Sequence, residues 1–150
     1  MARNMMKLKQ LTEGLVKALK EDSINRLMNK LKFVSADEGS VVCEMTVERR
    51  HRNLVGILHG GMTATLIDSV SGFALLTKNC RGVTVDLSVS YFYPIQPGQS
   101  ILIDANIIKC GQNIAFVTSK IRDVNNEKIL AIGRQSFFIT DKNVNIEDGC

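Results

Sequence analysis

The residues best suited to chemistry begin with a histidine and two glycines, His59-Gly60-Gly61, at the start of a predicted helix. Glycines leave the backbone N–H groups of the first helical turn unobstructed, and these groups can stabilise an oxyanion together with the helix dipole. The glycine pair is also consistent with a simple tight turn between a strand and a helix. The stretch from Asn53 to Met62 is therefore the first candidate for a functional site.

Asp68 is the second residue that could do chemistry, because it is the only charged residue between Arg52 and Lys78. It follows Gly61 by seven residues and lies on a stripe of small polar residues with helical spacing. Such a stripe is either a solvated helix face or a place where another chain approaches closely. A carboxylate in the second setting can act as a general base. The other members of the stripe are Thr65, Ser69 and Gly72.

These two candidate groups are too far apart to act on one carbonyl within a single chain. The helical rise of about 1.5 Å per residue separates Asp68 from the N–H groups near Gly60 and Gly61 by about 10–12 Å. Reacting atoms must approach to about 3–3.5 Å. If both groups are catalytic, each site must combine two chains, which predicts an obligate homodimer with two equivalent sites about a twofold axis.

Changes in hydrophobic periodicity predict the elements that must position these groups. Apolar residues at helical spacing predict an N-terminal helical segment, residues 1–32, whose apolar stripe packs on the domain. A membrane or targeting role for this basic segment is the alternative. A second, more apolar helix is predicted from Gly61 to about Thr77. Beyond Phe33 the period changes to two, and strands are predicted at 41–47, 83–91, 101–109, 114–123 and 128–139.

The order of these elements predicts the fold class. The last three strands are joined by short turns and are expected to form an antiparallel meander. One long apolar helix among about five antiparallel strands favours an α+β fold in which the helix packs on one face of the sheet. The 150 residues are predicted to form one domain, 1–150, that ends in a flexible tail, 141–150.

Composition and missing motifs disfavour several classes of function. No apolar run approaches the roughly 18–20 residues of a membrane helix. The chain has no nucleophile elbow, no HExxH and no phosphate-binding glycine loop. Two histidines, and four cysteines without zinc-ligand spacing, predict no metal site.

The distribution of charge and the N-terminus predict partners and location. The net charge of +4 arises in the N-terminal segment, which gives little support to nucleic-acid binding. The N-terminus lacks the apolar core of a secretory signal, so a cytoplasmic location is expected. A mitochondrial location stays open, because basic residues are scattered among apolar ones there.

Together these residues resemble the hotdog-fold acyl-CoA thioesterases, in particular the thioesterase superfamily member 2 type and the bacterial phenylacetate-pathway type. The resemblance implies an antiparallel sheet wrapped around a long central helix, and dimers that join edge to edge and pair into a tetramer. It also implies hydrolysis of fatty acyl-CoA, of medium to long chain, without metal or cofactor. The residues that carry it are Asn53, Gly56, Leu58, His59, Gly60, Gly61, Thr63, Ala64, Asp68 and Gly82 to Asp86.

The resemblance also implies a role for each site residue. Gly60 supplies the N–H that polarises the thioester carbonyl together with Asn53, and His59 helps to set Asn53 and the turn. Asp68 of the facing subunit activates water as the general base, and the Thr84 hydroxyl positions that water. The family commonly has serine at this last position, and threonine can make the same hydrogen bond with a stiffer side chain. The substrate- and CoA-binding residues that it implies are Gly61, Tyr91, Lys109, Gly111, Gln112 and Asn113.

Two other functions remain as alternatives. A hotdog dimer could bind acyl-CoA or a partner protein without turnover and use its basic N-terminal helix as the docking surface. Asp68 and Asn53 favour catalysis, because a binding module needs no buried carboxylate near a thioester. An enoyl-CoA hydratase is a third possibility, but the aspartate and histidine pair of such an enzyme is not evident at these positions.

Overall fold

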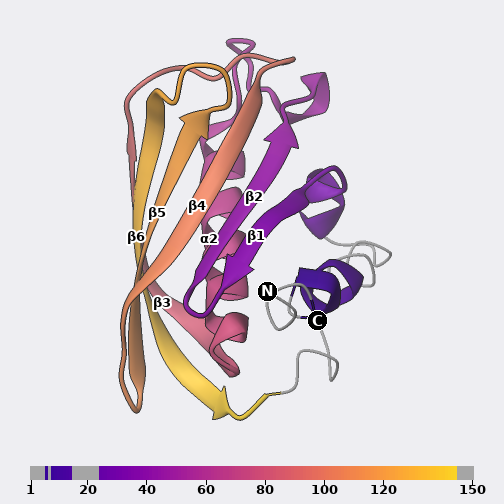
Figure 1. The fold of residues 1–150 in the computed structure, drawn as a ribbon. Helices are drawn as coiled ribbons and strands as arrows, with labels where there is room; N and C mark the ends of the chain where they lie inside the picture. The colour runs from indigo at the N-terminus through magenta and orange to yellow at the C-terminus, as the bar shows by residue number, and fades with distance from the viewer. Residues whose placement is uncertain (1–5, 7, 15–23, 145–150) are drawn as a thin grey trace.

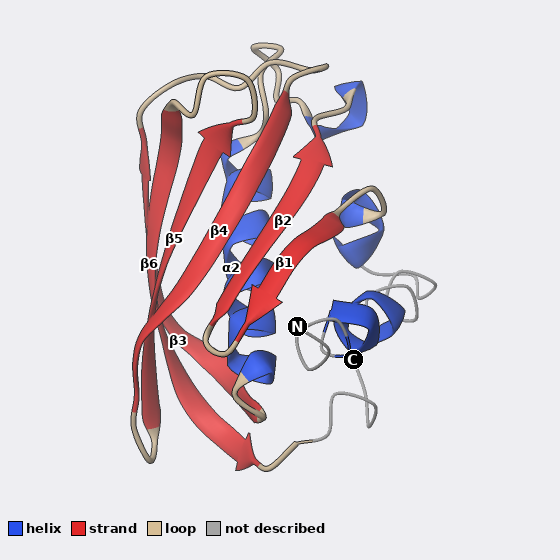
Figure 2. Cartoon of the chain, viewed as in Figure 1, coloured by secondary structure: helices blue, strands red, loops and turns tan. Residues whose placement is uncertain are grey.

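Six strands form a single antiparallel sheet, and one long helix lies along one of its faces (Figures 1 and 2). The strand order is β1-β2-β4-β5-β6-β3. A computed structural model of the chain describes residues 6, 8–14 and 24–144. Its elements are η1 (Ile24–Met28), β1 (Lys32–Asp37), β2 (Ser40–Thr46), η2 (Arg49–His51), α2 (Gly60–Thr77), β3 (Cys80–Tyr91), β4 (Ser100–Cys110), β5 (Ile114–Asp123) and β6 (Ile129–Lys142).

The core lies between α2 and the sheet. Leu66, Ile67 and Val70 of α2 have no exposed surface, and they face a sheet whose strands alternate buried and exposed side chains. This apolar layer also holds one polar contact, in which the Ser71 and Ser119 hydroxyls lie 2.8 Å apart. Burial of this apolar surface is the main favourable free energy that holds the helix on the sheet.

The predicted α+β fold and its meander are confirmed. The helix begins at Gly60, one residue earlier than expected, and β4, β5 and β6 are antiparallel neighbours. The predicted strands are found with slightly different ends. Residues 32–37, which form β1, were not predicted as a separate strand, because this edge strand is half exposed and has few apolar residues.

The predicted N-terminal segment is helical at residues 8–14, and Leu11, Met28 and Leu31 are buried in the core. Its stripe therefore packs on the domain in the described part, and residues 15–23 lie outside the described residues. No helix among the described residues is long and apolar enough to cross a membrane. At the other end of the chain β6 continues to Lys142, two residues into the predicted tail, and residues 145–150 again lie outside the described residues.

β3 has a strand on one side only among the described residues, because it ends the sheet order beyond β6. It is 12 residues long, and its apolar residues Val83 and Val85 are 56% and 59% exposed. A long edge strand with exposed apolar side chains is ready to pair with another strand. β3 runs antiparallel to the direction of α2, since Cys80 follows the end of the helix and the Tyr91 hydroxyl donates to the Gly60 carbonyl at its start.

The close approach of α2 to β6 predicts a stability effect at Gly133. A Cβ atom there would lie 2.5 Å from Cγ2 of Ile67, so Gly133→Ala overpacks the core. We expect this change to lower the free energy of unfolding by about 1–3 kcal/mol, measured by urea denaturation. In an Ile67→Ala background the added methyl group fits, and the cost of Gly133→Ala should largely disappear. Equal costs in the two backgrounds would contradict this packing.

Candidate active site

The loop before α2 is anchored at His51, the last residue of η2. The buried His51 ring accepts a hydrogen bond at Nδ1 from the Glu48 N–H at 3.0 Å, and the His51 carbonyl accepts from the His59 N–H at 2.8 Å. Glu48 also pairs with Lys30 at 2.6 Å and Arg50 at 2.7 Å. The hydrogen bond between His51 and His59 therefore joins the two ends of the loop, residues 52–59.

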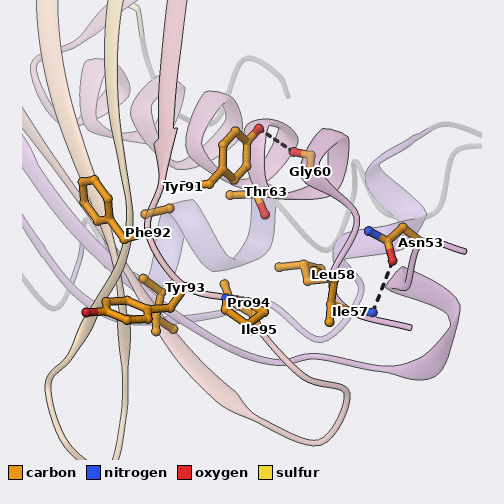
Figure 3. Close-up of a pocket in the computed structure, with 12 residues that line it drawn as sticks. Asn53, Ile57, Leu58, Gly60, Thr63, Tyr91, Phe92, Tyr93, Pro94 and Ile95 are labelled. Carbon is orange, nitrogen blue, oxygen red and sulfur yellow. Dashed lines mark hydrogen bonds between the residues drawn. The ribbon is translucent and has the colours of Figure 1, made fainter. Parts of the chain in front are cut away.

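Asn53 uses its side-chain oxygen to shape this loop. Oδ1 accepts hydrogen bonds from the N–H groups of Val55 at 3.0 Å and Ile57 at 3.3 Å, and the second bond is drawn in Figure 3. The turn between them needs Gly56, whose φ of +95° lies in the region that favours glycine. Because Oδ1 is committed to the loop, Nδ2 is left as a donor, and Figure 3 shows it turned away from the Ile57 N–H.

The His59-Gly60-Gly61 turn caps α2 and leaves the Gly60 N–H available. Nδ1 of His59 accepts from the Gly61 N–H at 2.9 Å, and the His59 carbonyl accepts from Thr63 N–H at 3.0 Å. The Gly60 N–H has no acceptor among the residues that the structure describes. The tight-turn and oxyanion interpretations of the glycine pair are therefore compatible, since the same turn presents an unpartnered donor at the positive end of the helix dipole.

A pocket of about 380 Å³ contains both donors of this region (Figure 3). Asn53 and Gly60 form a polar part of its wall, whereas Leu58, Ile95 and Leu130 form apolar parts. Its rim includes aromatic residues, and the Tyr93 ring lies 3.3 Å from the Lys128 ammonium group. The pocket therefore suits a carbonyl compound that carries an apolar chain.

Asp68 lies in a separate polar cluster on the side of α2 that faces β3 and β6. The Thr84 hydroxyl donates to Oδ1 of Asp68 at 2.7 Å. The Gln135 amide donates to the same Oδ1 and to the Thr84 hydroxyl oxygen, the latter at 2.8 Å. Both bonds to the Asp68 carboxylate end at Oδ1, so Oδ2 is not used by them and can accept a proton or bind water.

Gln135 is the residue of this cluster that was not predicted. It is 3% exposed, and its Oε1 is buried without a hydrogen-bond partner. A signal for it exists, because the alternation of β6 places Gln135 between Gly133 and Phe137 on the buried face. A buried amide needs polar partners, so its position opposite the helix could have marked it as a partner for Asp68.

The structure does not bring all predicted site residues together within one chain. Asp68 does not line the pocket that contains Asn53 and Gly60, and it lies eight positions after Gly60 on α2, about 12 Å along the axis. Gly61 and Tyr91 lie at the pocket end of the molecule, the latter in the pocket wall.

The predicted CoA-binding hairpin lies at the other end of β3. The hairpin closes with a hydrogen bond from the Gly111 N–H to the Ile114 carbonyl at 2.8 Å, and the Asn113 carbonyl accepts from the Ile139 N–H at 2.8 Å. Ile139 is opposite Gly82, near the beginning of β3. The remaining predicted residues of this hairpin are Lys109 and Gln112. Among the described residues no group of three or more acidic, histidine or cysteine side chains could hold a metal ion.

Comparisons with known proteins identify a family and related structures. The thioesterase superfamily model matches residues 55–130. The chain is 38% identical over 135 residues to acyl-coenzyme A thioesterase 13 of Homo sapiens, covering 88% of this chain and 96% of that protein. The crystal structure of zebra fish thioesterase superfamily member 2 superposes with a TM-score of 0.85 at 36% identity, over 88% of this chain and 97% of that one.

A related structure carries a bound coenzyme A derivative. A Streptococcus mutans protein bound to acetyl CoA superposes with a TM-score of 0.73 at 26% identity, covering 75% of this chain and 90% of that chain.

The buried His51 ring predicts a pH dependence of stability. Burial lowers the pKa of His51 from its ordinary value of 6.5, so the unfolded chain takes up the proton first as the pH falls. The contribution of the neutral ring is complete above about pH 6.5 and is lost below it, with a slope of at most about 1.4 kcal/mol per pH unit.

Urea unfolding at pH 7.5 and pH 5.5 measures this loss. His51→Asn is the matched control, because its side-chain oxygen can replace Nδ1 as an acceptor but does not titrate. The variant should lose less stability than the natural chain between the two pH values. The same loss in both proteins would contradict a neutral buried ring at His51.

Proposed function

Because the chain belongs to the thioesterase superfamily, we propose that it hydrolyses acyl-CoA thioesters to a free fatty acid and CoA. The resemblance noted from the sequence is confirmed for the family and for the hotdog fold. The observation that carries the proposal is the Gly60 N–H, which has no acceptor among the described residues and shares a pocket with the Asn53 side chain. The relatives named as acyl-CoA thioesterases and the relative bound to acetyl CoA support it.

Asn53 and Gly60 are proposed to polarise the thioester carbonyl. Both can donate a hydrogen bond into the pocket, the first through Nδ2 and the second through its backbone N–H. Donors that are fixed before the reaction stabilise the negative charge that develops on the carbonyl oxygen, and each is worth about 10²–10³ in rate. The fixed loop and the helix cap supply this rigidity, and His59 acts through the cap.

Asp68 is proposed to activate the attacking water. Oδ1 is held by Thr84 and Gln135, so Oδ2 is the oxygen that accepts the proton of the water. The water oxygen then forms a bond to the carbonyl carbon. Collapse of the tetrahedral intermediate breaks the carbon–sulfur bond, and the CoA thiolate leaves and takes up a proton. This chemistry requires no metal or cofactor.

The arrangement of β3 supports a site that two chains share. If the β3 strands of two copies pair antiparallel about a twofold axis, the Thr84 half of one strand lies beside the Tyr91 half of the other. Asp68 accepts a hydrogen bond from the Thr84 hydroxyl, and the Gly60 carbonyl accepts one from the Tyr91 hydroxyl. The pairing therefore moves one copy's Asp68 toward the other copy's Gly60, which is the geometry that the distance along α2 requires.

The same pairing explains the location of the predicted CoA-binding hairpin. In the fold of one copy, Lys109 and Gly111 lie at the same end of the molecule as the beginning of β3. The pairing would place them beside the pocket of the other copy. The apolar pocket wall supports a preference for acyl chains of medium to long length. Ile108, Phe116 and Phe138 are exposed on the face of the sheet opposite to α2, which supports a tetramer of two dimers.

Replacing Asp68 tests the general base. Asp68→Asn should lower kcat by about 10²–10⁴-fold while the affinity for a nonhydrolysable acyl-CoA analogue changes little. CoA release from esters of different acyl length, measured with wild-type protein and the variant side by side, gives both the activity and the length preference. Asp141→Asn, at an exposed carboxylate on β6, is the matched control. Undiminished turnover by Asp68→Asn would contradict the mechanism, and no turnover by wild type would favour a binding module.

Mixing two inactive variants tests the shared site. Asn53→Ala and Asp68→Ala chains are each expected to be inactive, but a hybrid dimer has one site with both residues intact. After subunit exchange of equal amounts, about a quarter of the wild-type activity should return. Mass spectrometry of the intact dimers verifies that exchange has occurred. If hybrids form without any activity, Asp68 and Asn53 do not act across two chains.

A further inference from the structure

Two peptide units meet at the Cα atom of Gly60, and their hydrogen bonds differ. The first unit joins His59 to Gly60. Its carbonyl accepts from the Thr63 N–H at 3.0 Å, and its N–H is the donor proposed to contact the thioester. The second unit joins Gly60 to Gly61, and its N–H donates to Nδ1 of His59 at 2.9 Å. The carbonyl of this second unit accepts from the Tyr91 hydroxyl at 2.9 Å, so the unit is held at both ends.

Of these hydrogen bonds, the one from Tyr91 comes from outside the turn. The other two link residues at most four positions apart, whereas Tyr91 follows Gly60 by 31 residues and ends β3. Figure 3 shows the Tyr91 hydroxyl directed at Gly60 beside the start of α2. The end of β3 is itself fixed to β6, because the Phe92 N–H donates to the Leu130 carbonyl at 2.9 Å. Tyr91 therefore connects the turn to the sheet.

The Tyr91 ring also lies on the side of Gly60 where other residues carry a side chain. A Cβ atom at Gly60 would be 3.6 Å from the Tyr91 hydroxyl oxygen and 3.7 Å from two ring carbons, which are ordinary van der Waals contacts. Glycine has more conformational freedom than any other residue, so its two peptide units rotate unless contacts hold them. The hydroxyl bond and the neighbouring ring supply such contacts.

We propose that Tyr91 is a positioning residue for the Gly60 N–H, an inference that rests on the proposed function. By fixing the peptide unit on one side of the Gly60 Cα, the hydroxyl limits rotation of the unit whose N–H serves the pocket. The same bond polarises the second unit, which strengthens the bond from its N–H to His59. A donor that is fixed before the reaction stabilises developing charge better than one that must reorient. Tyr91 acts through Gly60 and needs no contact with the substrate.

This role differs from the substrate- or CoA-binding role that the resemblance implies for Tyr91. A residue that binds substrate and transition state equally changes KM when it is altered, with kcat unchanged. A residue that positions the donor for the oxyanion contributes mainly in the transition state, so its loss lowers kcat. The bond from the Tyr91 hydroxyl to Gly60 is the observation that favours the second role.

Tyr91→Phe tests this role, because it removes the hydroxyl and keeps the ring. We expect kcat for acyl-CoA to fall by about 3–10-fold, the effect of one neutral hydrogen bond, with KM nearly unchanged. Thr46→Val is the matched control, because it removes an exposed hydroxyl on β2 that lies 2.9 Å from the Ser100 hydroxyl, and it should leave both constants unchanged. Mass spectrometry of the intact proteins verifies that both variants assemble as the natural chain does.

A spectroscopic measurement separates positioning from a general loss of stability. The probe is a nonhydrolysable ketone analogue of acyl-CoA, in which a methylene group separates the sulfur from a ¹³C-labelled carbonyl. Hydrogen bonds to the carbonyl oxygen polarise the carbonyl and move its ¹³C resonance downfield. At saturation, the downfield shift on binding should be smaller with Tyr91→Phe than with the natural chain or Thr46→Val.

The outcomes separate this inference from the proposed function. If the natural chain is active and Tyr91→Phe has the same kcat and the same ¹³C shift, the positioning role is overturned and the proposed function stands. A raised KM with unchanged kcat would overturn it as well, because the Tyr91 hydroxyl would then bind substrate. If the natural chain shifts the carbonyl resonance but releases no CoA, hydrolysis is contradicted, and the ¹³C comparison still decides the role of Tyr91. Neither turnover nor a shift with the natural chain would overturn both.

Discussion

The packing of α2 on the sheet is the interaction on which both parts of the candidate site depend. Leu66, Ile67 and Val70 are fully buried in this contact, and the absence of a side chain at Gly133 allows the helix to approach β6 closely. A helix held in this way keeps a fixed rise per residue, so the distance between any two of its residues is set by their spacing in the sequence. Gly60 at its start and Asp68 two turns later therefore keep a constant separation, and the two groups cannot approach each other within one chain.

Each functional group is fixed by neighbours that are remote in the sequence. The Gly60 N–H owes its position to the His59 cap and to the Tyr91 hydroxyl, which arrives from the end of β3. Asp68 is held by Thr84 of β3 and Gln135 of β6. Burying polar groups costs free energy unless their hydrogen bonds are made, so such a network favours a single arrangement over its alternatives.

The exposed edge of β3 is the feature of the fold on which the proposed dimer depends. An edge strand of 12 residues with exposed Val83 and Val85 would be a site of aggregation in a chain that stays alone. In the proposed dimer, pairing with a second copy would cover this edge and would bring together groups that one chain holds apart. Stability and catalysis would then place the same demand on β3, which accounts for a long edge strand that leaves apolar side chains exposed.

Much of the fold could be predicted because local patterns reflect burial directly. The apolar helix, the alternating strands and the His59-Gly60-Gly61 turn were recognisable, since helices and strands repeat with different periods and a glycine pair marks a turn. The rise of the helix also showed, without coordinates, that Gly60 and Asp68 cannot meet within one chain. The half-exposed strand β1 escaped prediction because it has little hydrophobic contrast.

Other features were decided by the tertiary structure alone. Gln135 became a partner of Asp68 only because β6, which is distant in the sequence, lies beside β3 in the sheet and opposite α2. The orientation of the Asn53 amide likewise follows from the N–H groups of its own folded loop. Periodicity reports which face of an element is buried, but the identity of the neighbour across that face depends on strand order and register, which are properties of the whole fold.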